Sequence, residues 1–154
     1  MFRKFTLSPV QTELFDEHSF FKAFSRDMKQ ARRSVIIESP YITVRRARDF
    51  AKLVRRCNKK LKITVITRNP HHHDGNLVTQ SIIGLAILKD SGINVIVCDD
   101  FRHRKLAIVD DQLLWEGSLN MLSHSNSKEI MRRTQSEELC RQMMKFTSLK
   151  KDLK

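Results

Sequence analysis

One stretch decides how this chain folds: Phe101-Arg-His-Arg-Lys-Leu-Ala-Ile-Val-Asp-Asp-Gln-Leu-Leu-Trp-Glu-Gly-Ser-Leu-Asn120. Within it, residues 105–110 and 112–116 form two short apolar runs that are too close together for a helix to lie between them. We therefore expect a β-hairpin that turns near Asp110 and Asp111. The hairpin ends a longer pattern in which helices and strands alternate.

That alternation predicts the fold class. Helices are expected at 16–33, 44–58, 77–90 and 136–146, and further strands at 34–39, 61–67 and 93–98. The helix at 77–90 is apolar over most of its circumference, which predicts that it is well buried. The pattern is typical of an α/β fold with a mixed, mainly parallel sheet covered by helices on both faces. We expect one domain over residues 1–154, with residues 1–11 and 148–154 poorly ordered.

Composition narrows the class of partner. The 154 residues include 29 Lys and Arg against 17 Asp and Glu, a formal net charge of +12. Apolar residues make up 40% of the chain, enough for a packed core, which excludes a disordered tail or a collagen. The positive charge favours a polyanionic partner, nucleic acid first and an anionic membrane surface second. No apolar run approaches the ~20 residues of a membrane span, and residues 1–10 do not resemble a secretory signal. We expect a soluble, cytoplasmic protein.

The hairpin stretch also carries a cluster of polar side chains. His103 and Lys105 are two residues apart on a strand, so both side chains project from one face. Gly117 lets the backbone turn closely, and Ser118 and Asn120 are again two residues apart. If the second strand returns alongside the first, these groups form a donor-rich cup suited to one phosphate group.

Such a cup suits phosphodiester cleavage, which needs a nucleophile, an acid for the leaving oxygen and positive charge on the non-bridging oxygens. Histidine supplies either of the first two, because its pKa of ~6.5 lets both protonation states exist near neutrality. Lysine and asparagine supply the third. One imidazole cannot readily attack from one side and protonate the leaving group on the other, so an in-line reaction requires a second histidine.

The pattern H-x-K-x4-D-x6-G-S-x-N, which runs from His103 to Asn120, resembles the HKD motif of the phospholipase D superfamily. With a single copy in about 150 residues, the chain is similar to the small bacterial nuclease branch, whose members build one active site from two identical subunits. The resemblance implies that His103 is the nucleophile in one subunit and the general acid in the other, and that Lys105, Ser118 and Asn120 bind phosphate. Asp110 belongs to the same catalytic motif, although we expect it to hold the hairpin rather than touch substrate.

The family also has a glutamate beyond G-S-x-N that orients the motif histidine, and Glu129 is the best candidate here. Further candidates for contact with substrate are Gly117 within the motif, Arg132 and Arg133 just after it, Tyr41, and Arg45, Arg48 and Lys52 in a basic stripe on the helix at 44–58. Tyr41 follows a strand end and Pro40, where its ring could stack on a base.

These residues predict a metal-independent endonuclease that acts as a homodimer through a phosphohistidine, with no cofactor. We expect no metal site: the three histidines at 71–73 are adjacent and point in different directions, and the three cysteines form no CxxC pair. Two alternatives remain open. One is a phospholipid phosphodiesterase or phosphatidyl-transfer enzyme that uses the same cup. The other is a nucleic-acid-binding module without turnover.

Overall fold

The computed structural model describes residues 10–123 and 126–154. Seven strands form one sheet in the order β1-β7-β6-β5-β2-β3-β4. The strands are β1 (Gln11–Asp16), β2 (Ser34–Glu38), β3 (Lys62–Arg68), β4 (Asn94–Cys98), β5 (Leu106–Val109), β6 (Leu113–Gly117) and β7 (Ile130–Gln135). The helices are α1 (Phe20–Gln30), α2 (Val44–Val54), α3 (Asn76–Asp90), α4 (Glu137–Phe146) and α5 (Leu149–Asp152), with a short 3-10 turn, η1 (Pro70–His72).

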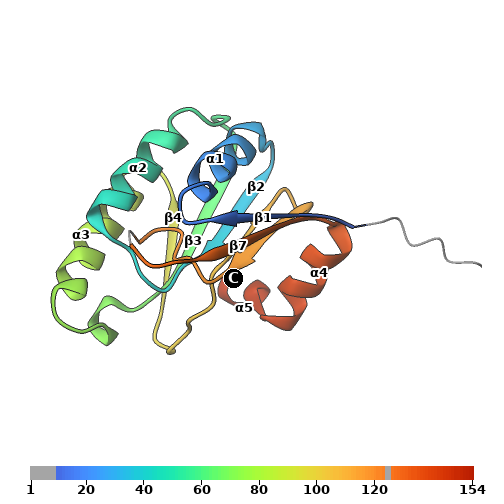
Figure 1. Cartoon of the computed structure of the whole chain (residues 1–154). Coiled ribbons are helices and arrows are strands. Elements are labelled where there is room, and N and C mark those ends of the chain that lie inside the picture. The colour runs from blue at the N-terminus through green and yellow to red at the C-terminus, as the bar shows by residue number, and fades with distance from the viewer. Residues whose placement is uncertain (1–9, 124–125) are drawn as a thin grey trace, which may run out of the picture.

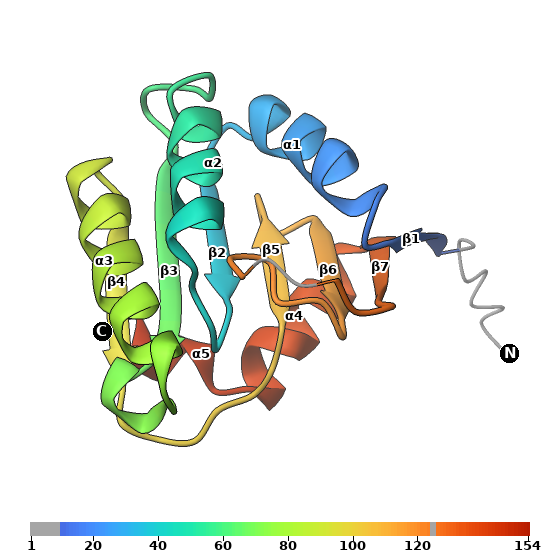
Figure 2. The same ribbon diagram turned by 60° about the vertical axis from the view of Figure 1, so that its left-hand side comes forward.

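Helices cover both faces of the sheet. The helices α1, α2 and α3 lie on one face and α4 and α5 on the other (Figures 1 and 2). Alternation along the strands explains this, because Val35 and Ile37 pack under α1 and α2 whereas Ile36 faces α4. The expected α/β class, with a mixed sheet and helices on both faces, is confirmed. Parallel pairing joins β2 to β3 and β3 to β4, and the remaining four pairings are antiparallel.

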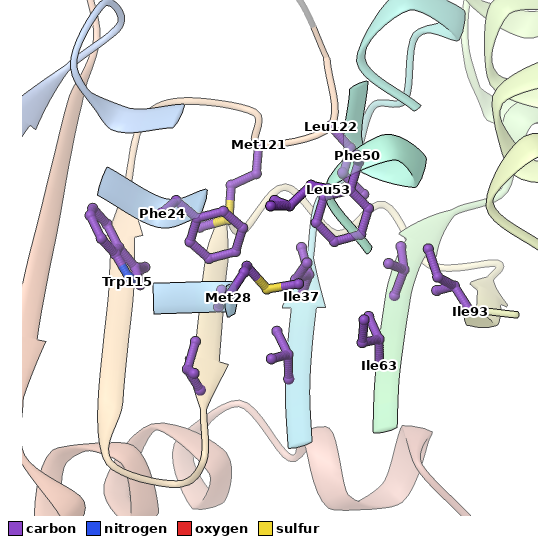
Figure 3. Close-up of a cluster of buried hydrophobic side chains, with 14 of the residues drawn as sticks. Phe24, Met28, Ile37, Phe50, Leu53, Ile63, Ile93, Trp115, Met121 and Leu122 are labelled. Carbon is purple, nitrogen blue, oxygen red and sulfur yellow. The ribbon is translucent and has the colours of Figure 1, made fainter. Parts of the chain in front are cut away.

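The larger core lies under α1 and α2. Trp115 is fully buried there among Phe20 and Phe24, and Figure 3 shows it beside Phe24 in a continuous apolar cluster. Its indole Nε1 donates to the carboxylate of Asp27 at 2.9 Å, and Arg133 on β7 donates to the same carboxylate at 2.7 Å. A buried carboxylate requires such partners, so this ion pair fixes α1 to the sheet.

The sequence did not predict β1 and β7, which pair at one edge of the sheet. Their addition leaves the sheet with more antiparallel than parallel pairings. Residues 11–16 belong to β1, and α1 begins at Phe20 rather than at Asp16. The Asp16 carboxylate instead accepts hydrogen bonds from the backbone N–H groups of His18 and Ser19 and so shapes the turn before the helix.

Two further expectations differ from the structure. The chain end at 148–154 was expected to fray, but α5 forms there and Leu149 is fully buried. The helix α3 was expected to be well buried, yet Ile82 and Ile83 are 47% and 44% exposed. Only the opposite side of α3 packs, where Gly84 allows close contact with Ile42 of the segment before α2.

Candidate active site

The motif side chains other than Asp110 lie at one end of the sheet, where the central strands β5 and β6 begin and end. The parallel strands β2 and β3 end there, and the antiparallel pairing aligns the start of β5 with the ends of β2 and β6, Leu106 facing Glu38 and Glu116. His103 and Lys105 precede β5, and Ser118 follows β6. The hairpin therefore brings His103 and Lys105 to the same end of the sheet as Ser118, and the ends of β2 and β3 bring Tyr41 and Arg68 there from distant parts of the sequence.

His103 and Lys105 are in direct contact. The Lys105 Nζ lies 2.9 Å from His103 Nδ1 and donates to the His103 carbonyl oxygen at 2.7 Å. The Tyr41 ring meets the imidazole edge-on, with centroids 5.8 Å apart. Burial, followed by the positive charges of Lys105 and Arg68, lowers the pKa of His103. A neutral imidazole is therefore favoured at pH 7, with Nε2 as the ring nitrogen that Lys105 does not contact.

Burial also lowers the pKa of Lys105, while the negative charge of Glu129 opposes this shift. Glu129 lies across the site and accepts a hydrogen bond from the Ser118 hydroxyl. The backbone fixes Ser118, since its N–H donates to the Ile130 carbonyl at 3.0 Å and its Oγ accepts from the Ile130 N–H at 3.0 Å. The structure thus brings Glu129 to the motif, but to its serine rather than to its histidine.

Gly117 makes this arrangement possible. A Cβ at this position would lie 2.1 Å from the Ile130 carbonyl oxygen, which real side chains do not tolerate. Its own N–H donates to the Lys105 carbonyl at 3.3 Å. The glycine therefore lets β5, β6 and β7 approach one another where the polar groups converge.

Asn120 lies on the loop that follows β6. The loop is held by its buried neighbour Leu122, whose carbonyl accepts from the Thr43 N–H at 2.9 Å and whose own N–H donates to Ser39 Oγ at 3.4 Å. Asn120 Oδ1 is buried and has no hydrogen-bond partner within the described residues. It faces a cavity of about 330 Å³ that Glu129 also lines. A buried acceptor without a partner is costly, so the amide is free to bind a donor from a ligand.

The loop that carries His103 has no regular secondary structure. Two of its arginines, Arg102 and Arg104, anchor it to β2 and to the C-terminal helical segment. Arg104, between the two motif residues, donates to the fully buried carboxylate of Glu38 at 3.1 Å and to the Thr147 carbonyl at 3.2 Å. Arg102 lies 3.6 Å from the same carboxylate and bonds Asp152 of α5 at 3.1 Å. Burial raises the pKa of Glu38, and the two guanidinium groups oppose this.

Two of the predicted site residues lie away from this end of the sheet. Asp110 is at the opposite end of β5, where its carboxylate accepts backbone N–H bonds from Arg32, Arg33 and Ser34 at 2.7–3.0 Å. Its expected role in the hairpin agrees with this position, whereas its place among the catalytic residues does not. Arg133 faces α1 and bonds Asp27, so its guanidinium is not directed toward the motif.

The other basic candidates lie on the surface. Arg132 is exposed on the α4 side of β7, 3.9 Å from Glu116. Arg45, Arg48 and Lys52 are exposed along α2, on the face of the sheet that α1 also covers. They form an open basic surface rather than part of the cup.

The sequence missed two residues near the motif. Arg68 ends β3, donates to the His72 carbonyl at 2.7 Å, and places its guanidinium over the exposed Phe101 ring. His73 is buried against Tyr41, with ring centroids 4.9 Å apart. No local sequence pattern distinguishes Arg68 from other arginines at strand ends. The run of histidines at 71–73 did indicate a loop, and the structure places His73 of that loop near the site.

The histidines at 71–73 point in different directions. His71 is exposed, His72 stacks on Phe101, and His73 packs on Tyr41. Across the described ranges, no three His, Cys, Asp or Glu side chains gather as a metal-binding group. Within the same ranges, no helix has the length and apolarity to cross a bilayer.

The family model described as "Cardiolipin synthase, PLD-like domain" matches residues 24–150. The chain belongs to this phospholipase D-like family. The match begins within α1 and ends within α5, and it includes the whole motif from His103 to Asn120. Family membership agrees with the phosphodiesterase expected from the sequence. None of the curated protein sequences matches the chain.

Solved structures share the phospholipase D-like fold. NucT from Helicobacter pylori is 21% identical with a TM-score of 0.70, and the match covers 90% of this chain and 93% of that one. The phospholipase D family member Nuc from Salmonella typhimurium is 14% identical with a TM-score of 0.71, covering 90% and 91%. TrmBL2, an archaeal chromatin protein that binds DNA, is 12% identical with a TM-score of 0.56, covering 97% and 55%.

Proposed function

We propose that this chain is a phosphodiesterase that cleaves nucleic acid internally, with His103 as the nucleophile. The observation that carries the proposal is the contact between His103 and Lys105, 2.9 Å apart. Ser118 lines the same hollow as Lys105, and Asn120 shares a cavity with Glu129, the carboxylate that the Ser118 hydroxyl contacts. An imidazole beside an ammonium, an amide and a hydroxyl matches the needs of a single phosphodiester group.

In the first step, His103 Nε2 attacks phosphorus. A nitrogen–phosphorus bond forms, the phosphorus–oxygen ester bond breaks, and the leaving oxygen takes a proton from a general acid. Before this attack, Lys105 moves from Nδ1 onto a non-bridging oxygen, and the imidazole hydrogen passes through solvent from Nε2 to Nδ1, which leaves the Nε2 lone pair free. Water then attacks phosphorus and releases His103, with a base removing the water proton. Asn120 donates to a non-bridging oxygen through its amide Nδ2, and the Ser118 hydroxyl turns from Glu129 to donate to another.

A second histidine must supply the acid and then the base, because one ring cannot act on both sides of an in-line displacement. We propose that His103 of the partner subunit has this role in a homodimer. His103 is exposed just before the central strand β5, which leaves room for a second copy to approach the end of that strand. The chain therefore completes its site only when two copies meet.

Nucleic acid is the proposed substrate class because of charge. The net charge of +12 and the exposed cations Arg45, Arg48 and Lys52 along α2 suit a phosphate backbone. DNA binding by TrmBL2, which shares the fold, supports the same class. A phospholipid is the second candidate, favoured by the apolar side chains Met143 and Phe146 in a hollow beside Lys105.

Cleavage assays test the proposal. Labelled single-stranded DNA, duplex DNA, RNA and phosphatidylcholine vesicles are incubated with the protein, with and without EDTA. We expect nucleic acid to be cut equally in both conditions, and we expect His103→Ala and Lys105→Ala to abolish cutting while Lys62→Ala, at the far end of β3, does not.

Three results would contradict the proposal. Loss of cutting on chelation with recovery on adding magnesium would contradict the metal-independent mechanism. Turnover of lipid alone would indicate the phospholipid alternative. Salt-dependent binding of nucleic acid without products would identify a binding module. Circular dichroism of each variant separates lost chemistry from lost folding.

A further inference from the structure

A groove runs from the polar cluster along α4. One hollow of about 560 Å³ is lined at one end by Lys105 and Ser118 and at the other by Phe146. A second hollow of about 430 Å³ continues beneath α4 and shares Arg132 and Phe146 with the first. We call this pair of hollows the α4 groove. Its position beside the motif makes it a candidate for holding the part of a substrate that extends from the cleaved group.

Phe146 is unusual for a side chain in a packed helix. Its side chain is 89% exposed, the most of any large hydrophobic residue in the described part of the chain. Fraying does not explain the exposure, because the next turn is held on both sides. The Thr147 hydroxyl bonds the Met143 carbonyl, and Leu149 beyond it is fully buried. The ring is thus held at the rim of the groove with its surface in water.

The groove also carries positive charge. The Arg132 side chain is 56% exposed, and its ion pair with Glu116 is long at 3.9 Å, which leaves guanidinium donors free to bind an anion. Arg104 lines the same hollow as Arg132 but already bonds Glu38 and the Thr147 carbonyl, and the Glu116 carboxylate lines both hollows, so Arg132 is the cation available to an anion. An aromatic ring beside a cation is an arrangement by which proteins hold single strands, because a base stacks on the ring while a phosphate binds the cation.

We propose that the α4 groove binds one strand of nucleic acid, with an unpaired base stacked on Phe146 and a phosphate on Arg132. This inference rests on the proposed function and adds a preference for single strands. A base within a duplex already stacks on its neighbours and cannot present its face to the ring. A lipid acyl chain is the less suitable occupant. Arg132 lines both hollows, and its guanidinium would lie against an apolar acyl chain that offers it no anionic partner.

Binding is measured in the His103→Ala background, so that no substrate is cut. The probe is a short single-stranded oligonucleotide that contains 2-aminopurine, whose fluorescence falls when the base stacks. We expect Phe146→Ala and Phe146→Leu each to weaken binding about tenfold and to reduce the quenching, and Phe146→Trp to keep both. Arg132→Gln is expected to weaken binding and to lower the slope of log affinity against log salt by about one.

The control is Arg141→Gln, which removes an exposed arginine of α4 that pairs with Glu138 outside the groove. Its affinity should equal that of the parent. The inference is overturned if Phe146→Ala binds like the parent, if Phe146→Leu keeps full affinity, or if Phe146→Ala weakens binding to phosphatidylglycerol vesicles alone. If either Phe146 variant binds like the parent but the protein that retains His103 still cuts nucleic acid, the groove is refuted and the proposed function stands. Failure of that protein to cut nucleic acid would instead refute the proposed function.

Discussion

Asp110 offers a test of whether a motif residue acts through folding rather than chemistry. Its carboxylate accepts backbone N–H bonds from Arg32 at 2.8 Å, Arg33 at 2.7 Å and Ser34 at 3.0 Å, and so ties the end of the α1 segment to the hairpin. Asp110 has φ 52° and Asp111 has φ 57°, a left-handed pair that makes a tight two-residue turn. Asp110→Asn is the suitable change, because asparagine tolerates this backbone and only the charge and one acceptor are lost.

Hydrogen bonds to a charged group each stabilise by roughly 1.5–3 kcal/mol, and asparagine retains one acceptor oxygen at a position that water partly reaches. We therefore expect Asp110→Asn to lower the free energy of unfolding by about 2 kcal/mol. For a domain of this size, that corresponds to a fall in Tm of about 4–8 °C. Asp111 lies in the same turn but accepts none of these three hydrogen bonds, so Asp111→Asn should change Tm little.

The effect depends on pH. Burial alone would raise the pKa of Asp110, but the three backbone N–H groups outweigh it and hold the pKa below its ordinary value of 3.8. Because the folded-state pKa is the lower one, the stabilisation is fully present above about pH 4 and is lost as the pH falls through the folded-state pKa. The difference in Tm between the parent and Asp110→Asn should therefore shrink in acid.

Calorimetry at pH 7 and pH 3 measures the stability, and cleavage per folded molecule at 25 °C measures the chemistry. We expect Tm to fall while kcat stays within about twofold of the parent. An unchanged Tm together with a kcat reduced a hundredfold would refute the reasoning, because it would show that Asp110 acts on the reaction from the far end of its strand.

Three other changes test the site. Arg68→Gln removes a charge that lowers the pKa of His103, so the acid limb of log kcat/KM should move to higher pH, and an unmoved limb would contradict this. Gly117→Ala should cost about 2–3 kcal/mol and most of the activity, since its Cβ would collide with the Ile130 carbonyl; a normal Tm in thermal melts would show that the strands can separate there. Asp152→Asn weakens the contact that ties Arg102, just before His103, to α5, while Asp100 keeps its own contacts with that guanidinium; kcat should fall by up to about tenfold with little change in Tm, and an unchanged kcat would place that contact outside catalysis.

The sequence predicted the fold class and one contact within the motif, but not every strand of the sheet. The spacing of His103 and Lys105 placed both side chains on one face, and the structure has them in contact. The strand β7 escaped prediction because Arg133 occupies an inward position that an apolar residue would ordinarily fill. Its partner Asp27 lies 106 positions earlier in the chain, so no local pattern reveals the buried ion pair.

The edge strand β1 was missed for a different reason. Leu14 is exposed and only Phe15 packs inward, so β1 has no alternation of buried residues to detect. The helix α3 is apolar over most of its circumference, which predicted that it is well buried. A sequence pattern does not show how many elements pack around a helix, and in the structure Ile82 is exposed. Arg68 was missed because its importance depends on β3 ending beside the motif, which is a property of the topology alone.

The central claim is that the imidazole of His103 becomes covalently attached to phosphorus. The most direct measurement is mass spectrometry of the protein quenched with base during turnover of a single-stranded oligonucleotide, because phosphohistidine survives base and is lost in acid. The account predicts an acid-labile nucleotidyl adduct on the peptide that contains His103, absent from His103→Ala. Steady cleavage with no adduct on that peptide, or with an adduct on another residue, would contradict it.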